Sequence, residues 1–173
     1  MPLGDERGSI IMIRNSIIFA CFCMLSVAVS AGTDVTYGAT APQTNTITTD
    51  GMAGIRVGMT RRQIAHRLGE HINFGCWETD FGKVSIDRGV VELVQTESPR
   101  LATLSGARVG MSERALRRLY PRGLEVPRPD DPYGRYYYHS MSGNSLRFQT
   151  SEGKIADITA GKRDAVMRDS YCS

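Results

Sequence analysis

An internal repeat constrains the fold of this chain more than any other feature of its sequence. Residues 54–60 read Gly-Ile-Arg-Val-Gly-Met-Thr, and 52 positions later residues 106–112 read Gly-Ala-Arg-Val-Gly-Met-Ser. Self-similarity at a period of this length is typical of a duplicated supersecondary unit that buries its apolar face against its neighbour. The repeat therefore predicts two units of the same construction, packed side by side.

Each copy of the repeat opens a segment that the pattern predicts to be a short amphipathic helix. Thr60 followed by Gln63 forms a capping box, and Ser112 is the matching N-cap residue of the second copy. Apolar residues recur at helical spacing behind each cap, and arginines occupy the other positions, as on a solvated helix face. Gly69 ends the first helix and Pro121 ends the second.

Alternating apolar and polar residues after each helix predict antiparallel strands. A tight turn at Arg88-Gly89 joins two of the strands of the first copy, whereas three prolines make residues 127–134 an irregular loop. The predicted fold class is α+β, with two tandem helix-then-antiparallel-strands repeats, at about 54–100 and 106–160, forming one domain. The expected strands are residues 72–77, 83–87, 90–96, 123–126, 135–141, 146–150 and 154–160.

The N-terminal region predicts export. Residues 12–31 combine a basic start, an apolar run and the small-residue end Val29-Ser30-Ala31, so residues 1–31 are interpreted as a signal peptide, with initiation at residue 1 or at Met12. A membrane anchor is the less favoured alternative, because about 15 apolar residues fall short of the roughly 20 that span a bilayer. Residues 32–50 contain seven threonines and predict a disordered leader. The folded domain is expected at 51–173, with a C-terminal tail at 161–173.

Four cysteines divide between the predicted signal peptide and the predicted mature chain. Cleavage removes Cys21 and Cys23, and it leaves Cys76 and Cys172 as an even pair in a periplasmic or secreted protein. A disulfide between them would close a loop of about 96 residues and stabilise the fold by about 4 to 5 kcal/mol in the chain-entropy model. The alternative is a catalytic Cys76, which is less favoured because no nucleophile motif surrounds it.

Charge and composition argue against several classes of function. The formal net charge of +3 is too small and too dispersed to predict nucleic-acid binding. His66, His71 and His139 lack metal-ligand spacing, and no glycine-rich phosphate-binding loop is present. Adjacent Asp130 and Asp131 fall in the proline-rich loop, where a solvated turn is the simpler interpretation. We therefore expect that the protein is not an enzyme and that it binds neither a metal ion nor a cofactor.

The repeated Val-Gly-Met-Thr/Ser motif and the short helix behind it resemble the opening of small outer-membrane assembly lipoproteins of the SmpA/OmlA type. The duplication resembles the tandem architecture of secreted β-lactamase inhibitory proteins and of exported bacterial proteins that are sometimes labelled lectins. Unlike the lipoproteins, this chain lacks a lipobox. The resemblance implies an exported, non-catalytic binding protein of the bacterial cell envelope, which docks a protein partner as an inhibitor, immunity or assembly factor. A glycan-binding envelope protein is the alternative.

The inhibitor-like family implies an aromatic sheet face that contacts the partner, and a tyrosine-rich segment here matches it. On a strand, Tyr136 and Tyr138 point to one face while Tyr137 and His139 point to the other. Exposed tyrosines are enriched at protein interfaces and at sugar-stacking surfaces, although tyrosines also simply stabilise sheets. Trp77, beside Cys76, is expected in the core. The predicted contact residues are Tyr133, Tyr136, Tyr138, Asp130 and Asp131.

Overall fold

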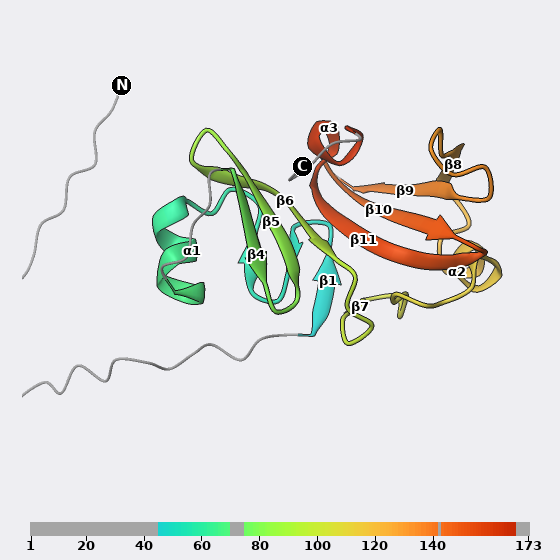
Figure 1. Cartoon of the computed structure of the whole chain (residues 1–173), viewed down its shortest axis with the longest axis horizontal. Helices are drawn as coiled ribbons and strands as arrows, with labels where there is room; N and C mark the ends of the chain where they lie inside the picture. Colours follow the sequence, from blue (N-terminus) through green and yellow to red (C-terminus); the bar gives the residue numbers. More distant parts are fainter. Residues whose placement is uncertain (1–44, 70–74, 142, 169–173) are drawn as a thin grey trace, which may run out of the picture. The chain divides into compact units, whose positions relative to one another are not determined.

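The computed structural model describes residues 45–69, 75–141 and 143–168 (Figure 1). The predicted signal peptide and most of the predicted leader lie outside these residues. The larger of two sheets has seven strands in the order β4-β5-β6-β11-β10-β9-β8, and all neighbours are antiparallel. Its strands are β4 (Cys76–Thr79), β5 (Gly82–Asp87), β6 (Val90–Thr96), β8 (Leu124–Pro127), β9 (Arg135–Met141), β10 (Asn144–Ser151) and β11 (Lys154–Lys162).

A smaller sheet and three short helices complete the described part of the chain. The smaller sheet has the order β3-β2-β1-β7, in which β1 and β7 are parallel. Its strands are β1 (Thr46–Thr48), β2 (Gly51–Met52), β3 (Ile55–Arg56) and β7 (Ala102–Thr103). The helices are α1 (Arg61–Leu68), α2 (Glu113–Leu119) and α3 (Arg163–Val166).

The predicted fold class, two tandem helix-then-strands α+β repeats, is wrong. The described residues are mostly β, with two sheets of four and seven strands, and α1 and α2 bury only Ile64 and Leu116 respectively. Helices of seven or eight residues have too little apolar surface to form a layer of their own. The predicted boundary between the repeats also disappears, because β6 pairs directly with β11 in one continuous sheet.

The repeated motif instead specifies a local contact that occurs twice. In the first copy, Val91 N donates to Met59 O at 2.8 Å, and in the second Ile155 N donates to Met111 O at 2.8 Å. Each Gly-Met turn therefore binds the first residues of the second strand of a hairpin, β5-β6 or β10-β11.

The predicted helix caps are confirmed. The Thr60 hydroxyl accepts from the backbone of Gln63, and the Gln63 side chain accepts in return from the backbone of Thr60. The Ser112 side chain accepts from Ala115 N at 3.4 Å. Local side-chain chemistry of this kind depends on neighbouring residues only, so the sequence predicts it well.

The folded part of the chain begins before residue 51. Strand β1 lies within the segment that we predicted to be a disordered leader, and its central residue, Ile47, is fully buried. It pairs with β2 on one side and with β7 on the other. Flanking threonines favour a strand once an apolar residue among them is buried.

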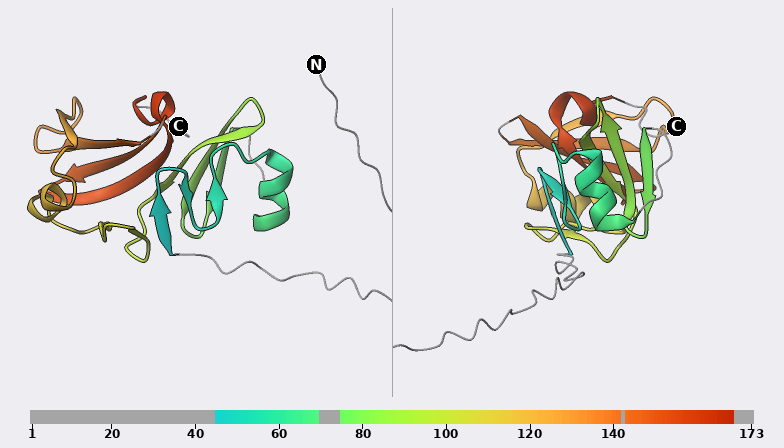
Figure 2. Two further views of the ribbon diagram at one scale, coloured as in Figure 1. Left: turned by 180° about the vertical axis from the view of Figure 1, so that it is seen from behind. Right: turned by 90° about the vertical axis from the view of Figure 1, so that its left-hand side faces the viewer.

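The seven-stranded sheet has two unlike faces. On one face the small sheet and helices α1 and α2 bury a single apolar core, to which Ile47, Ile64, Leu116, Val84 and Phe148 all belong (Figure 2). On the other face α3 covers a smaller cluster of Leu93, Tyr136, Tyr138, Ala165 and Val166. We call this second face the α3 face.

We predict that Gly161→Ala destabilises the protein by about 2 to 4 kcal/mol, because overpacking at this point would separate β11 from β6. An added Cβ would lie 2.5 Å from Glu92 O and 2.6 Å from Leu93 Cα. Urea unfolding measures the effect.

Gly89→Ala is the matched control for Gly161→Ala. Gly89 has a φ of 82° but open space around it, so its substitution costs only the backbone strain of about 1 kcal/mol. Equal losses for the two variants would contradict a close approach of the strands at Gly161.

Candidate functional site

Cross-strand neighbours form continuous rows of side chains on the α3 face. One row crosses all seven strands, and a second lies beside it on the strands from β11 to β8. Direct neighbours in an antiparallel sheet point to the same face, so each row shares one surface. The first row is Glu78, Lys83, Gln95, Thr159, Arg147, Tyr138 and Leu124, and the second is Asp157, Gln149, Tyr136 and Val126.

Tyr136 and Tyr138, which we predicted to be exposed contact residues, are buried. Their exposed fractions are 7% and 8%, because α3 packs over them. The alternation of the strand was predicted correctly, since Tyr137 points to the opposite face and joins the main core. The expected exposure is wrong because the sequence pattern gave no sign that both faces of β9 are covered.

The ring of Tyr136 lies beside two arginines, one on β10 and one in the loop between β8 and β9. The guanidinium carbon of Arg147 lies 4.8 Å from the centre of this ring, and that of Arg128 lies 5.7 Å from it. Both distances fall within the range of cation–π attraction. The ring therefore links a buried arginine of β10 with an arginine of the loop between β8 and β9.

The loop between β8 and β9, residues 128–134, is held by its own side chains; we call it the contact loop. Arg128 binds Asp130, and its Nη1 also donates to Asp131 Oδ2 at 3.3 Å. Asp131 accepts from Ser151 Oγ and from Tyr133 N, both at 2.9 Å. Arg128 lowers the pKa of Asp130, and the hydrogen bond from Ser151 lowers that of Asp131. Both carboxylates, predicted as contact residues, therefore brace the loop.

Tyr133 is exposed, as predicted, with an exposed fraction of 79%. Two apolar residues of the edge strand β8 accompany it at this end of the sheet, Leu124 at 56% and Val126 at 37%. We call Leu124, Val126 and Tyr133 the contact patch. Sequence reasoning missed Leu124 and Val126, although their alternation with Glu125 on a strand that carries Pro127 is typical of a sheet edge.

Asp157 is the buried carboxylate of the α3 face. Burial raises its pKa to about 6, the positive charge of Arg147 opposes that shift, and Glu97 adds to it. Its Oδ1 accepts from Thr159 Oγ1 at 3.4 Å. Sequence analysis missed this residue, because alternation along β11 places it on a face that we did not expect to be covered.

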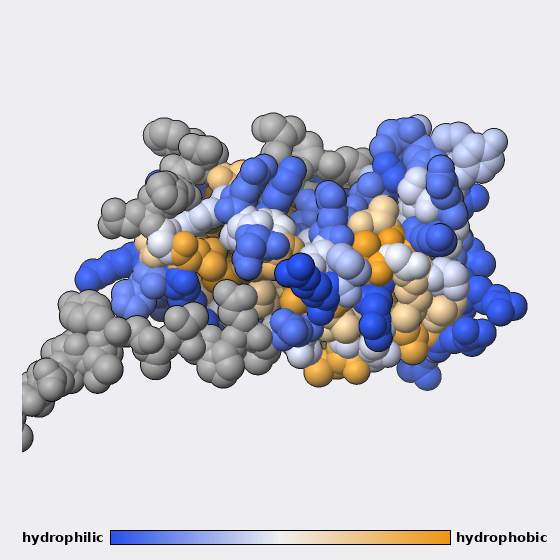
Figure 3. All heavy atoms as spheres, turned by 60° about the horizontal axis from the view of Figure 1, so that its bottom comes forward, coloured by the Kyte–Doolittle hydropathy of each residue, from blue (hydrophilic) through white to orange (hydrophobic). Residues whose placement is uncertain are grey.

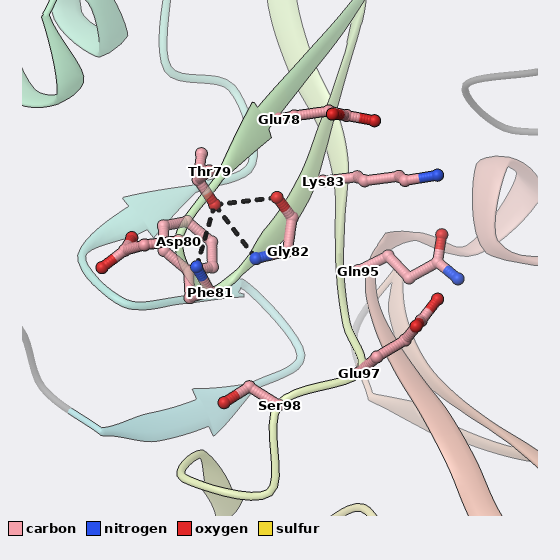
Figure 4. A pocket seen from close by; sticks show the side chains of 9 residues that line it. All are labelled: Glu78, Thr79, Asp80, Phe81, Gly82, Lys83, Gln95, Glu97 and Ser98. Carbon is pink, nitrogen blue, oxygen red and sulfur yellow. Dashed lines mark hydrogen bonds between the residues drawn. The ribbon is translucent and has the colours of Figure 1, made fainter.

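A polar groove of about 390 Å³ lies at the other end of the α3 face (Figure 4). Glu78, Lys83 and Gln95 are register neighbours on β4, β5 and β6, and their side chains extend in the same direction in Figure 4. The Thr79 hydroxyl stabilises the turn between β4 and β5, since it donates to Gly82 O at 2.8 Å. The sequence gave no local motif for this groove, which depends on the register of three strands.

Other exposed apolar residues are scattered. Figure 3 shows hydrophobic side chains interspersed with hydrophilic ones on the face that it presents. Leu104, in the loop after β7, has an exposed fraction of 83%. Isolated apolar side chains are ordinary on protein surfaces, so exposure alone assigns Leu104 no function.

Within residues 45–69, 75–141 and 143–168, no helix is long and apolar enough to cross a membrane. In those ranges no three His, Cys, Asp or Glu side chains are grouped so that they could hold a metal ion.

Comparison with known proteins identifies no family for this chain. No protein-family model and no curated protein matches the chain. Among solved structures, it is similar to an extracellular protein containing an SCP domain from Bacillus anthracis, with a TM-score of 0.49 and 7% sequence identity. The similarity covers 70% of this chain and 49% of that chain, so this chain matches about half of that protein's length. Such a distant likeness indicates no function.

We predict that Tyr136→Ala and Tyr133→Ala have unlike effects on stability. Tyr136→Ala removes a buried ring and should lower the free energy of unfolding by about 3 kcal/mol or more. Tyr133→Ala removes an exposed ring and should change it by less than about 0.5 kcal/mol. Chemical denaturation of both variants measures the difference, and equal losses would contradict the burial described above.

Proposed function

We propose that this chain is an exported, non-catalytic binding protein of the cell envelope that docks a protein partner through the contact patch. The observation that carries the proposal is the contact loop, which is braced internally and presents Tyr133 almost fully to solvent. Its edge strand adds Leu124 and Val126 to the same end of the sheet. Exposed apolar residues beside polar ones are typical of protein contact surfaces.

The construction of the contact loop favours binding. A loop that is ordered before it meets its partner loses little conformational entropy on binding. Arg128 donates to Thr150 O at 3.4 Å, and this hydrogen bond holds the loop against β10. The loop backbone also packs closely on β10 at Gly134, where an added Cβ would lie 2.8 Å from the same carbonyl oxygen. Tyrosine supplies a large contact area with few rotatable bonds. The loop therefore presents Tyr133 at little entropic cost.

A protein partner is favoured over a glycan. The glycan-binding alternative requires several exposed tyrosine rings on which sugars could stack. Of the three tyrosines predicted to be exposed, α3 buries Tyr136 and Tyr138. Leu124 and Val126 offer aliphatic contact area, which suits a protein surface better than a sugar face. An inhibitor, immunity or assembly factor, as the resemblance implies, would use such a patch.

A non-catalytic role is part of the proposal, and the chemistry of the groove supports it. Besides Thr79, its other hydroxyl belongs to Ser98, whose Oγ accepts from Arg100 N at 3.3 Å. Nucleophilic catalysis needs a hydroxyl or thiol beside a general base. Both hydroxyls of the groove instead hold backbone turns, Thr79 through Gly82 O and Ser98 through Arg100 N.

Export is supported by the signal-like N-terminal sequence, and the geometry around Cys76 is compatible with the predicted disulfide. Arg168 binds Glu92 at 2.6 Å, and Glu92 accepts from Ser85 Oγ at 3.1 Å. Ser85 is in turn the register partner of Cys76. Cys172 lies outside the described residues, but it is only four positions after Arg168, a reach of roughly 13 Å.

We predict that the protein isolated from its host lacks residues 1–31 and contains the Cys76–Cys172 disulfide. Peptide mapping by mass spectrometry, with and without reduction, identifies both features. Cys172→Ser should lower the free energy of unfolding by about 2 to 5 kcal/mol under oxidising conditions, and by much less under reducing conditions. Two free thiols in the native protein would contradict the prediction.

We predict that a photo-crosslinker at position 133 captures a protein partner in intact cells, and that Leu124→Ala reduces the yield about tenfold or more. Position 104 serves as the matched control, because Leu104 is about as exposed as Tyr133, at 83% against 79%, but lies outside the contact patch. A crosslink that forms from position 104 and not from 133 would contradict the proposal. Binding to a glycan array that Tyr133→Ala abolishes, without a protein crosslink, would replace it with the lectin-like alternative.

A further inference from the structure

We propose that the buried carboxylate Asp157 controls the order of the contact loop, holding the loop when ionised and loosening it when protonated. This inference rests on the proposed function, since it concerns the regulation of the same contact patch. It follows from a chain of side-chain contacts that leads from the interior of the α3 face to the loop.

The first step of this chain joins Asp157 to Arg128 through Gln149. With its amide oriented to satisfy both neighbours, Gln149 donates from nitrogen to Asp157 Oδ2 at 3.0 Å. Its oxygen then accepts from Arg128 Nη1 at 3.1 Å and from Nη2 at 3.3 Å. An ionised carboxylate only accepts hydrogen bonds, so it fixes the amide in this orientation.

The second step joins Arg128 to the exposed residues of the loop. Asp131, which Arg128 binds, accepts from Tyr133 N, and Gly134 N donates to Asp131 O at 3.0 Å. A protonated Asp157 offers an O–H donor and no longer requires the amide nitrogen of Gln149. Arg128 would then lose a fixed acceptor and a nearby negative charge, and the loop would lose part of its support.

The charged groups around Asp157 come from several elements. Arg147 of β10 and Arg128 of the contact loop favour the ionised form, whereas Glu97, just after β6, opposes it. Arg168, just after α3, forms an ion pair with Glu92 at 2.6 Å. Burial outweighs the two arginines, so the pKa of Asp157 is raised to about 6, within the range that an exported protein meets.

Global stability and loop order should respond to pH in opposite directions. A carboxyl group with a raised pKa in the folded state stabilises the protein fully below its unfolded value of about 3.8, and this contribution is lost as pH rises through about 6. The loop, in contrast, is held above pH 6 and loosened below it. General acid unfolding cannot produce this opposition.

Amide hydrogen exchange of the isolated protein between pH 5 and pH 8, normalised to intrinsic rates, tests the proposal without a partner. Exchange at Tyr133 and Gly134 should rise about fivefold to tenfold as pH falls through 6, the effect of losing one charge-assisted hydrogen bond. The amide of Val91, bonded to Met59 O, should not respond. An unchanged loop in the wild-type protein would overturn the inference and leave the contact patch itself unaffected.

Three variants separate the steps of the pathway. Asp157→Asn should make loop exchange fast and independent of pH, and Asp87→Asn, at an exposed carboxylate, should keep the wild-type response. Gln149→Leu should leave Asp157 titrating, as its carboxyl carbon shift would show, while the loop no longer responds. This variant keeps the test decisive if Asp157→Asn fails to fold. A full pH response in either Asp157→Asn or Gln149→Leu would overturn the proposal.

Discussion

The pairing of β6 with β11 is the interaction on which the rest of the structure depends. Four register pairs, from Thr96 opposite Ile158 to Leu93 opposite Gly161, join the two halves of the chain into one sheet. Because register fixes which side chains share a face, this pairing aligns the groove residues of β4–β6 with the buried charges of β10 and β11. Without it, the first row on the α3 face would be interrupted between Gln95 and Thr159, and the core on the opposite face would be divided at the same place.

The contact loop depends on the neighbouring strands β9 and β10 as much as on its own sequence. Its prolines limit the backbone, but the direction of the loop is set by Arg128, which reaches Thr150 and Gln149 on β10 and stacks above Tyr136 on β9. Buried polar residues are stable only when each is satisfied, so this polar cluster links the loop to the interior of the sheet. The contact surface that we propose at the end of the sheet is therefore supported by the charged side chains of the α3 face.

The sequence predicted local structure better than assembly. Strands β6 and β9 have the bounds expected from alternation, and the caps at Thr60 and Ser112 depend only on neighbouring residues. The predicted fold class was wrong because equal motifs suggested two equal helix-then-strands units, whereas each motif forms a turn that binds a hairpin of a mostly β structure. At the candidate site, Tyr133 was predicted from the resemblance to the inhibitor-like family, which implies an aromatic contact surface, and it is exposed. Burial of Tyr136 and Tyr138 was missed because four residues of α3, far along the chain, cover them.

The parallel pairing of β1 with β7 has a consequence for the order in which the chain folds. Thr46 lies opposite Ala102, and β6 meets β11 across more than sixty positions, so both sheets are closed by segments that are distant in sequence. Closing such long loops is entropically costly before any contact is gained, which slows folding in proteins with high contact order. Residues from both ends of the described part of the chain must therefore be available before the two sheets can close.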